Sequence, residues 1–228
     1  MKDCLTLYHG SRECIEHPEF GKGKLTNDYG QGFYCTEFYD LASEWASKMQ
    51  GEDGYVNQYT LQTKELRILD LTNPKYNILN WMTLLLKNRT FALSTEISIE
   101  AKEYLINHFS VDVSGYDIIT GYRADDSYFS FAEDFLNNTI SVEHLSRAMK
   151  LGKLGIQYVL VSEKAFNALT FEKADLVANN KYYPLYQKRD LVARQNYRNS
   201  KSHLKNIKNE LYVIDIIREE IQNGDPRI

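Results

Sequence analysis

The sequence predicts an α+β fold for this chain of 228 residues, and three observations bear on the fold and on how many domains it has. Segments typical of strands and of helices are mixed along the chain without the regular strand–helix alternation of a parallel sheet. No GxGxxG or GxxxxGK[ST] segment stands between a strand and a helix, which excludes the usual dinucleotide and triphosphate cradles. The hydrophobic content of 43% is sufficient for one packed domain with an appendage.

The N-terminal elements are predicted from alternation and from glycine. Residues 5–9 alternate apolar and polar side chains, as in a half-buried strand, and a Gly-Ser turn signal follows them. Residues 28–36 carry two glycines and lead into a short aromatic strand. Asp40 is the expected N-cap of a helix over residues 41–49.

The rest of the chain contains both kinds of pattern. Further strands are predicted at residues 56–61, 67–71, 116–122 and 157–161. Apolar residues at three- and four-residue spacing predict further helices at residues 78–88, 97–109, 129–137, 142–151 and 204–217, with a short helix or turn at 165–169. We expect residues 1–180 to form the main domain, and residues 181–228 to form a basic linker with an amphipathic C-terminal helix.

Composition argues against several classes of protein. The sequence has no run of 18 apolar residues and no signal-peptide core, so it predicts a soluble, cytoplasmic protein without a membrane partner. The three cysteines have no CxxC spacing and no histidines are paired at metal-ligand intervals, so neither disulfides nor a metal site is indicated. The net charge of −4 argues against a protein that coats nucleic acid along its whole surface.

A local excess of positive charge lies in residues 181–208, which hold eight lysines and arginines against a single acidic residue, Asp190. Tyrosines interleaved with these charges suit contact with nucleic acid, and a solvated helix face with packed tyrosines is the alternative. The apolar stripe of the last predicted helix suits core packing, an inhibitor protein or a second copy of the chain.

Three features near the N-terminus carry candidate chemistry. Tyr8-His9-Gly10-Ser11 ends the first predicted strand, and a GxGFY segment follows about two dozen residues later. Trp45 stands eleven residues after Tyr34, on the predicted helix. Each feature alone has a structural explanation: a satisfied histidine, glycines at a turn, and aromatic residues in the core.

Together, the order and spacing of these features resemble the His–Tyr branch of the ADP-ribosyltransferases, which includes diphtheria toxin and the poly(ADP-ribose) polymerases. The combination YHGS, DYGQGFYCT and A-x-x-W-A is most similar to an uncharacterised bacterial family of small, toxin-like proteins in that superfamily. The resemblance covers about residues 5–175. It implies a split antiparallel sheet with flanking helices and a C-terminal helical extension, and NAD⁺ as co-substrate.

The resemblance assigns NAD⁺ binding to His9, Gly10, Ser11, Tyr34 and Trp45. His9 is expected to donate to a ribose hydroxyl while a neighbour fixes its second nitrogen. Gly10 leaves room for its backbone to pair with the carboxamide of nicotinamide. Tyr34 and Trp45 are expected to sandwich the nicotinamide ring, with stacking and cation–π energies of about 0.5–2 kcal/mol each.

The third catalytic position is less well defined. The resembled family places a glutamate near the start of a late strand, and Gln157 stands at that position here. A neutral amide can orient a ribose but supplies no negative charge to an oxocarbenium-like transition state. Asp125 and Asp126 are alternative sources of a carboxylate, with Glu133 a weaker one, although both aspartates also suit a solvated loop or a helix cap.

These inferences predict a mono-ADP-ribosyltransferase that transfers ADP-ribose from NAD⁺ to a macromolecular acceptor, protein or nucleic acid. The role that the resemblance implies is that of a bacterial toxin or phage-defence effector. Three alternatives stay open: a catalytically silent module that binds NAD⁺ or ADP-ribose, an NAD⁺ glycohydrolase, and a structural interaction protein.

Overall fold

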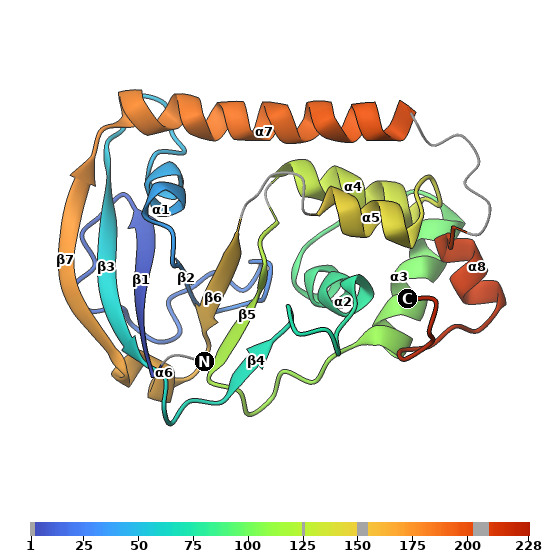
Figure 1. The fold of residues 1–228 in the computed structure, drawn as a ribbon, viewed down its shortest axis with the longest axis horizontal. Helices are drawn as coiled ribbons and strands as arrows, with labels where there is room; N and C mark the ends of the chain where they lie inside the picture. The colour runs from blue at the N-terminus through green and yellow to red at the C-terminus, as the bar shows by residue number, and fades with distance from the viewer. Residues whose placement is uncertain (1–2, 125, 150–154, 203–209) are drawn as a thin grey trace.

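The computed structural model of the chain describes residues 3–124, 126–149, 155–202 and 210–228. The described residues form a seven-stranded, mostly antiparallel sheet flanked by helices, which confirms the predicted α+β class (Figure 1). The strands are β1 (Cys4–Ser11), β2 (Phe33–Thr36), β3 (Gly54–Gln62), β4 (Ile68–Asp70), β5 (Ile118–Tyr122), β6 (Ile156–Leu160) and β7 (Leu169–Val177). The helices are α1 (Tyr39–Ala46), α2 (Ile78–Asn88), α3 (Glu96–Phe109), α4 (Asp126–Leu136), α5 (Val142–Ala148), α6 (Glu163–Asn167), α7 (Asn179–Ser202) and α8 (Val213–Arg218).

The sheet has a weak joint near its centre. Its strand order is β4-β5-β6-β2-β1-β3-β7, with only β4 and β5 parallel among the described strands. Strand β1 pairs with β3 along its whole length, from Cys4 opposite Gln62 to Ser11 opposite Tyr55. Within the described chain, β1 pairs with β2 at one position alone, Tyr8 opposite Thr36. The two halves of the sheet are therefore joined through a single residue pair.

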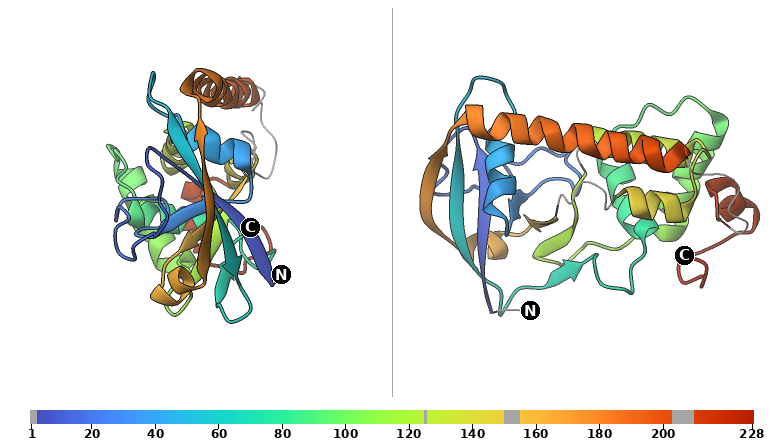
Figure 2. Two further views of the ribbon diagram at one scale, coloured as in Figure 1. Left: turned by 90° about the vertical axis from the view of Figure 1, so that its left-hand side faces the viewer. Right: turned by 45° about the horizontal axis from the view of Figure 1, so that its top comes forward.

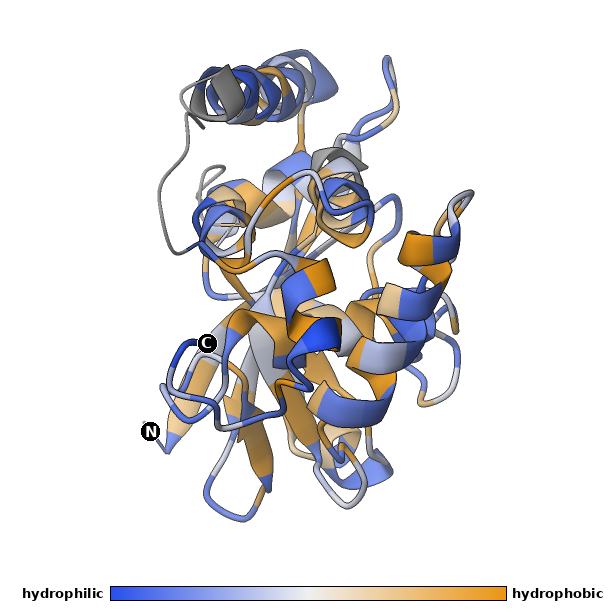
Figure 3. Cartoon of the chain, turned by 90° about the vertical axis from the view of Figure 1, so that its right-hand side faces the viewer, coloured by the Kyte–Doolittle hydropathy of each residue, from blue (hydrophilic) through white to orange (hydrophobic). Residues whose placement is uncertain are grey.

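Helices α2 to α5 and α8 gather on the side of β4, β5 and β6, at the right of Figure 1. They share a core with large, fully buried side chains, among them Trp81, Phe109, Phe131 and Phe135. Capping fixes where these helices begin: the Asn77 side chain accepts from the backbone of Asn80, and the Asn80 side chain accepts in return. Figure 3 shows hydrophobic and hydrophilic residues along the helices of this half, as expected of helices that bury one face.

Helix α1 covers β1 and β3 through small side chains. Ala42 and Ala46 are buried against Val56 of β3, which brings the helix close to the sheet. The helix begins at Tyr39 after an extended Phe38, so the predicted N-cap at Asp40 was wrong by two residues. Asp40 lies instead in the first turn, where a carboxylate still interacts favourably with the helix dipole.

Helix α7 is the largest difference from the prediction, because residues 179–202 form a long helix where a basic linker was expected. Figures 1 and 2 show it running across the molecule, from α1 at one end to α4 and α5 at the other. Arg189 donates two hydrogen bonds to the buried Glu44 of α1, and the Tyr197 hydroxyl donates to Asp134 of α4 at 2.6 Å. These tertiary contacts stabilise a helix that local sequence does not favour.

Two other C-terminal predictions differ from the structure. Strand β7 was not predicted, because charged residues at Glu172, Lys173 and Asp175 obscure its alternation; such charges are typical of an edge strand. The helix predicted at 204–217 is found in part: Val213–Arg218 forms α8, and residues 210–212 before it are not helical. Residues 203–209 lie outside the described part of the chain. None of the described helices is long and apolar enough to cross a bilayer.

Candidate functional site

A cavity of about 810 Å³ lies beside the joint between β1 and β2. Its walls come from β1, β2 and the loop between them, from helices α1, α6 and α7, from the start of β6, and from the residues that directly follow α2 and β5. It brings together five of the predicted site residues: His9, Gly10, Tyr34, Trp45 and Gln157. A volume in the range of about 300–1,000 Å³ is typical of sites for small molecules and cofactors.

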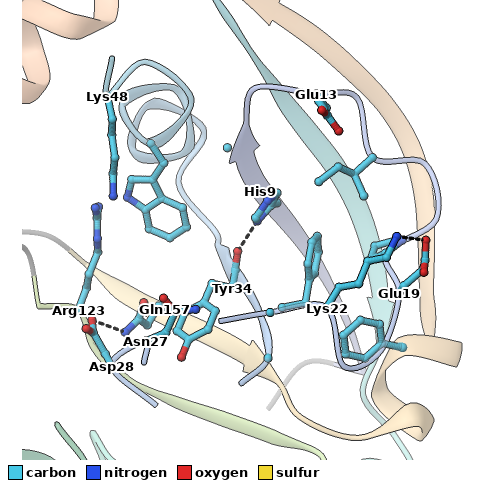
Figure 4. A pocket seen from close by; sticks show the side chains of 18 of the residues that line it. His9, Glu13, Glu19, Lys22, Asn27, Asp28, Tyr34, Lys48, Arg123 and Gln157 are labelled. Carbon is cyan, nitrogen blue, oxygen red and sulfur yellow. Dashed lines mark hydrogen bonds and ion pairs between the residues drawn. The ribbon is translucent and has the colours of Figure 1, made fainter. Parts of the chain in front are cut away.

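His9 stands on β1 immediately after the last residue that pairs with β2. Its Nδ1 lies 2.7 Å from the backbone oxygen of Tyr34 (Figure 4). The side chain therefore connects β1 and β2 at a position where their backbones do not pair. A carbonyl only accepts, so Nδ1 carries the proton in this contact. The ring of Phe33 covers His9 at a centroid distance of 4.4 Å.

This environment determines whether the second nitrogen of His9 donates or accepts a hydrogen bond. Burial lowers the pKa of His9, although the hydrogen bond to the Tyr34 carbonyl partly opposes the shift. The neutral ring with a proton on Nδ1 presents Nε2 as an acceptor. The expected donation from His9 to a ribose hydroxyl is therefore reversed: the hydroxyl would donate and Nε2 would accept.

The Tyr34 side chain is fixed by its own loop. Its hydroxyl donates to the Gly30 carbonyl at 2.6 Å and accepts from the Tyr29 amide at 3.1 Å. Burial raises the pKa of Tyr34 above its ordinary value. The hydroxyl thus closes the turn that precedes β2, and the ring is left to line the cavity.

Gly10 and Ser11 have structural tasks that sequence reasoning missed. A Cβ at Gly10 would lie 1.9 Å from the backbone oxygen of Ala42, so the glycine is required for α1 to pack on β1. The Ser11 hydroxyl donates to the Glu13 carbonyl and accepts from the Asn57 side chain at 3.0 Å. Ser11 is not among the residues that line the cavity, and it anchors the loop after β1.

Trp45 has a neighbour that the sequence did not predict. The guanidinium of Arg123, which directly follows β5, lies 4.4 Å from the centre of the Trp45 ring. The indole Nε1 is buried and has no hydrogen-bond acceptor among the described residues. One face of the ring is therefore covered by a cation, at a place where the predicted sandwich would put the nicotinamide ring.

Gln157 is 3% exposed at the start of β6, where its backbone pairs with Thr36 and Gly121. Its Nε2 lies 3.4 Å from the Tyr122 carbonyl and 3.5 Å from Oδ2 of Asp28, both long for hydrogen bonds. The side chain is thus held at the cavity wall by weak contacts, next to a carboxylate.

Asp28 is a site residue that sequence reasoning missed. It is 8% exposed, lines the cavity, accepts from the Ala124 amide at 3.1 Å and lies 3.7 Å from Nε of Arg89. Burial raises the pKa of Asp28, while the Ala124 amide and the charges of Arg89 and Arg123 oppose the shift. The signal that could have found it is its place directly before the glycine turn of DYGQG.

Of the three other predicted carboxylates, Glu133 is the one whose side chain the structure describes. Asp125 lies outside the described residues, and Asp126 begins α4 with its side chain outside them. Glu133 lies further along α4, where its backbone oxygen caps Asn137, and it does not line the cavity.

The charges of the cavity are separated along its length. Figure 4 shows Lys48 and Arg123 pointing toward one another on one side of His9, and Glu13 and Glu19 on the other. Asp28 and Gln157 lie at the cationic end (Figure 4). Among the described residues, no group of three or more histidine, cysteine or acidic side chains could hold a metal ion.

Comparison with known proteins gives one match. A family model described as "Protein of unknown function (DUF3990)" matches residues 5–171, which include β1 to β6, α1 to α6 and most residues of the cavity. No curated protein and no solved structure matches the chain.

Proposed function

The chain belongs to the DUF3990 family of proteins of unknown function, and we propose that it is a mono-ADP-ribosyltransferase. The donor is NAD⁺ and the acceptor is a macromolecule. One observation carries the proposal: His9 and Tyr34, 25 residues apart, are joined by a hydrogen bond at the point where β1 and β2 separate, and both face the same cavity.

The proposal includes an ADP-ribosyltransferase-like fold. In such a fold the central sheet is split and the dinucleotide occupies the split. The single residue pair between β1 and β2, with the cavity beside it, supports this assignment. The cavity volume of about 810 Å³ and the orphaned Nε1 donor of Trp45 are features that a polar ligand of dinucleotide size would satisfy.

The residues of the joint would orient the nicotinamide riboside. Nε2 of His9 accepts from a ribose hydroxyl, and its ring is held by Phe33 on one face and by the Tyr34 carbonyl at Nδ1. The Tyr34 ring, fixed through its hydroxyl, supplies a rigid face for the nicotinamide ring. Such fixed groups place the ribose for reaction without reorganisation at the moment of bond breaking.

Asp28 would supply the negative charge that Gln157 lacks. In the reaction the bond between ribose C1′ and nicotinamide breaks, the electron pair leaves with nicotinamide, and positive charge develops on the ribose. A carboxylate beside Gln157 stabilises that charge and takes the proton that the acceptor loses. The raised pKa of Asp28 brings the carboxyl closer to the working pH of a general base.

A labelling experiment tests the proposed transfer and identifies the class of the acceptor. Purified protein would be incubated with labelled NAD⁺ and cell lysate, then digested separately with protease and with nuclease, while released nicotinamide is measured. Label bound to macromolecules supports the transferase, and the digestion that frees it identifies the acceptor as protein or nucleic acid. Nicotinamide without transferred label would instead support a glycohydrolase, and neither product would contradict both enzymes.

A catalytically silent NAD⁺-binding module is a second candidate, favoured by the neutral Gln157 at the position where the ADP-ribosyltransferases that the chain resembles have a glutamate. Variants that move the carboxylate between positions 28 and 157 distinguish the silent module from the transferase. If Asp28 is the working carboxylate, Gln157→Glu places a second negative charge about 3.5 Å from it and lowers activity by mutual repulsion. Combining Gln157→Glu with Asp28→Asn should then restore part of it. If the native protein is silent, Gln157→Glu alone should create nicotinamide release.

A further inference from the structure

A second cavity, of about 780 Å³, lies in the helical half of the molecule. Its walls come from the segment between β4 and α2, the end of β5, helix α5, and three residues after α7, which are Glu210, Arg227 and Ile228. Figure 1 shows β4, α2, α5 and the C-terminus together to the right of β6. The described linings of the two cavities have no residue in common, since Tyr122 lines the second cavity and Arg123 the first. The proposed NAD⁺ site therefore does not account for this cavity.

Much of the lining of the second cavity is apolar or aromatic. The described residues of this kind are Leu71, Pro74, Tyr76, Ile78, Tyr122, Val142 and Ile228. Three of them, Leu71, Ile78 and Val142, are nearly fully buried and belong to the core that helices α2 to α5 share, so this part of the lining is fixed by packing. A cavity of this size with an apolar lining and a few polar groups is typical of a site for a small molecule.

The two arginines of this lining already have carboxylate partners. Nη2 of Arg147 lies 3.2 Å from Oε1 of Glu210, which also lines the cavity. Arg227 pairs with Asp225 and with Glu219, neither of which is among the lining residues. Each guanidinium is therefore matched by at least one carboxylate. In the described part of the chain, neither of them pairs with the other acidic side chain that borders the cavity.

Glu143 is that other acidic side chain. It lies in the first turn of α5, and its Oε2 is buried without a hydrogen-bond partner among the described residues. The helix dipole favours a carboxylate in this turn, but that attraction does not require the oxygen to leave water. A carboxylate that is partly withdrawn from water without a donor is unfavourable, and native proteins leave few such groups. A cation with N–H donors in the cavity would compensate it.

The electrostatic surroundings also favour a cation. Tyr212, directly before α8, has a pKa above its ordinary value, chiefly because of burial and further because of the negative charges of Glu210, Asp215 and Glu143. These carboxylates act on the same phenol, so their negative potentials add at this side of the cavity. An anionic ligand would be repelled by Glu143 and Glu210, which both line the cavity.

We propose that the second cavity binds an organic cation, whose ammonium or guanidinium group pairs with Glu143 and whose apolar body contacts Ile78 and Tyr122. Charge-assisted hydrogen bonds to the carboxylate hold the head group, and removal of the apolar body from water adds to the affinity. The cation comes from one of two sources: a free small molecule or the basic side chain of another protein. The inference goes beyond the proposed function, because it requires neither NAD⁺ nor any residue of the first cavity.

Glu143→Gln is the decisive variant, because glutamine keeps the size of the side chain and removes its negative charge. Ser146→Phe is the second variant: Ser146 lines the cavity from α5, and phenylalanine there fills part of the volume without changing any charge. Glu103→Gln on α3 is the matched control, since it makes the same exchange at an exposed helical position that lines neither cavity.

Binding of the full chain to phenethylamine, to agmatine and to phenylethyl alcohol, the uncharged counterpart of phenethylamine, would be measured by calorimetry without NAD⁺, with thermal melts to verify folding. We expect wild type and Glu103→Gln to bind phenethylamine at least about ten-fold more tightly than the alcohol. Glu143→Gln should weaken both cations about ten-fold and leave the alcohol unchanged, and Ser146→Phe should weaken all three probes.

A capped Ala-Arg-Ala peptide distinguishes the two sources of the cation. Binding of the peptide as tight as that of agmatine identifies a basic side chain of another protein, and binding of agmatine alone identifies a free molecule. Failure of wild type to bind either cation at about 10 mM would overturn the inference, as would equal affinity for phenethylamine and the alcohol. Equal affinity of wild type and Glu143→Gln for the cations would also overturn it. These outcomes do not depend on whether the chain transfers ADP-ribose.

Discussion

The two edges of strand β1 differ more than any other pair of neighbouring surfaces in the sheet. Toward β3, all eight of its residues pair in register, up to Ser11 opposite Tyr55. Toward β2, pairing among the described residues is limited to Tyr8 and Thr36. The next residue, His9, contacts the opposite strand through its side chain instead of through its backbone.

This difference separates stability from binding within one strand. The edge of β1 that pairs fully with β3, here called the closed edge, includes buried apolar residues such as Leu7, which lies near Leu61 of β3. The backbone hydrogen bonds between the two strands satisfy the polar backbone groups of these residues. The edge of β1 toward β2, here called the open edge, adjoins a cavity with buried polar groups. The Trp45 N–H has no acceptor among the described residues, Gln157 makes only long hydrogen bonds, and Asp28 is a buried carboxyl with a raised pKa. Groups held in unfavourable surroundings are typical of sites that a ligand completes.

The largest effect is expected from His9→Ala at the open edge. This change removes the proposed acceptor for the ribose hydroxyl and leaves the Tyr34 carbonyl without the His9 donor. NAD⁺ turnover should fall about 1,000-fold, equivalent to about 4 kcal/mol in the barrier. Nicotinamide release measures it, and His108→Ala on α3 is the control. Full turnover by a folded His9→Ala protein would refute the site.

Leu7→Ala tests the closed edge. Leu7 is fully buried, so its truncation should lower the free energy of unfolding by about 2–5 kcal/mol. Turnover per folded molecule should stay near that of wild type, because the side chain does not line the cavity. Urea unfolding and nicotinamide release on the same preparation measure both quantities. A loss of turnover comparable with that of His9→Ala would show that the two edges are not separable.

Asp28→Asn should move activity and stability in opposite directions. Loss of the carboxylate should lower turnover about 100-fold, or about 2.7 kcal/mol. The asparagine oxygen can still accept from the Ala124 amide, and the cost of burying a charge is removed, so the melting temperature should rise. A variant that melts lower and keeps its activity would contradict both assignments.

The pH dependence of Asp28→Asn sharpens the same test. The pKa of Asp28 is raised above 3.8, its ordinary value in the unfolded chain, so the native state binds the proton more tightly. Its contribution to stability is therefore present at low pH and is lost as the pH rises through the native pKa. Unfolding free energies measured across this range should show the wild type losing stability relative to Asp28→Asn. Parallel curves would indicate an unshifted pKa.

The smallest effect is expected for Ser11→Ala. Ser11 belongs to the histidine–glycine segment but bonds to Glu13 and Asn57 outside the cavity. Its removal should lower the free energy of unfolding by about 0.5–1.5 kcal/mol and leave NAD⁺ affinity unchanged. A calorimetric affinity weaker than that of wild type by ten-fold would place Ser11 in the binding site after all.

The resemblance to the ADP-ribosyltransferases, carried by motifs on predicted strands, pointed to His9, Tyr34 and Gln157, and all three line the cavity. Asp28 was missed because its partners, Ala124 and Gln157, are 96 and 129 residues away, and folding alone brings them together. Its place before the glycine turn of DYGQG marks a turn residue, and only the tertiary contacts show that this turn residue is buried beside the cavity.

Helix α7 shows the same limit for the fold. Pro184 lies inside it, and the polar and basic residues around Pro184 form no regular apolar stripe, so the sequence does not mark this segment as a helix. The helix depends on Arg189 bonding to Glu44 and on Tyr197 bonding to Asp134, each more than 60 residues away in sequence. Tertiary contacts of this kind stabilise a helix without producing a periodic pattern in its sequence.

The close approach of α1 to Gly10 has a consequence for how the family evolves. A side chain at this position would strike the Ala42 carbonyl and push α1, with Trp45 and Lys48, away from the sheet. Selection for folding therefore retains glycine after His9 whether or not a ligand is ever bound. A protein that had lost the proposed NAD⁺ chemistry would still need this glycine for folding, so the glycine alone does not indicate that activity.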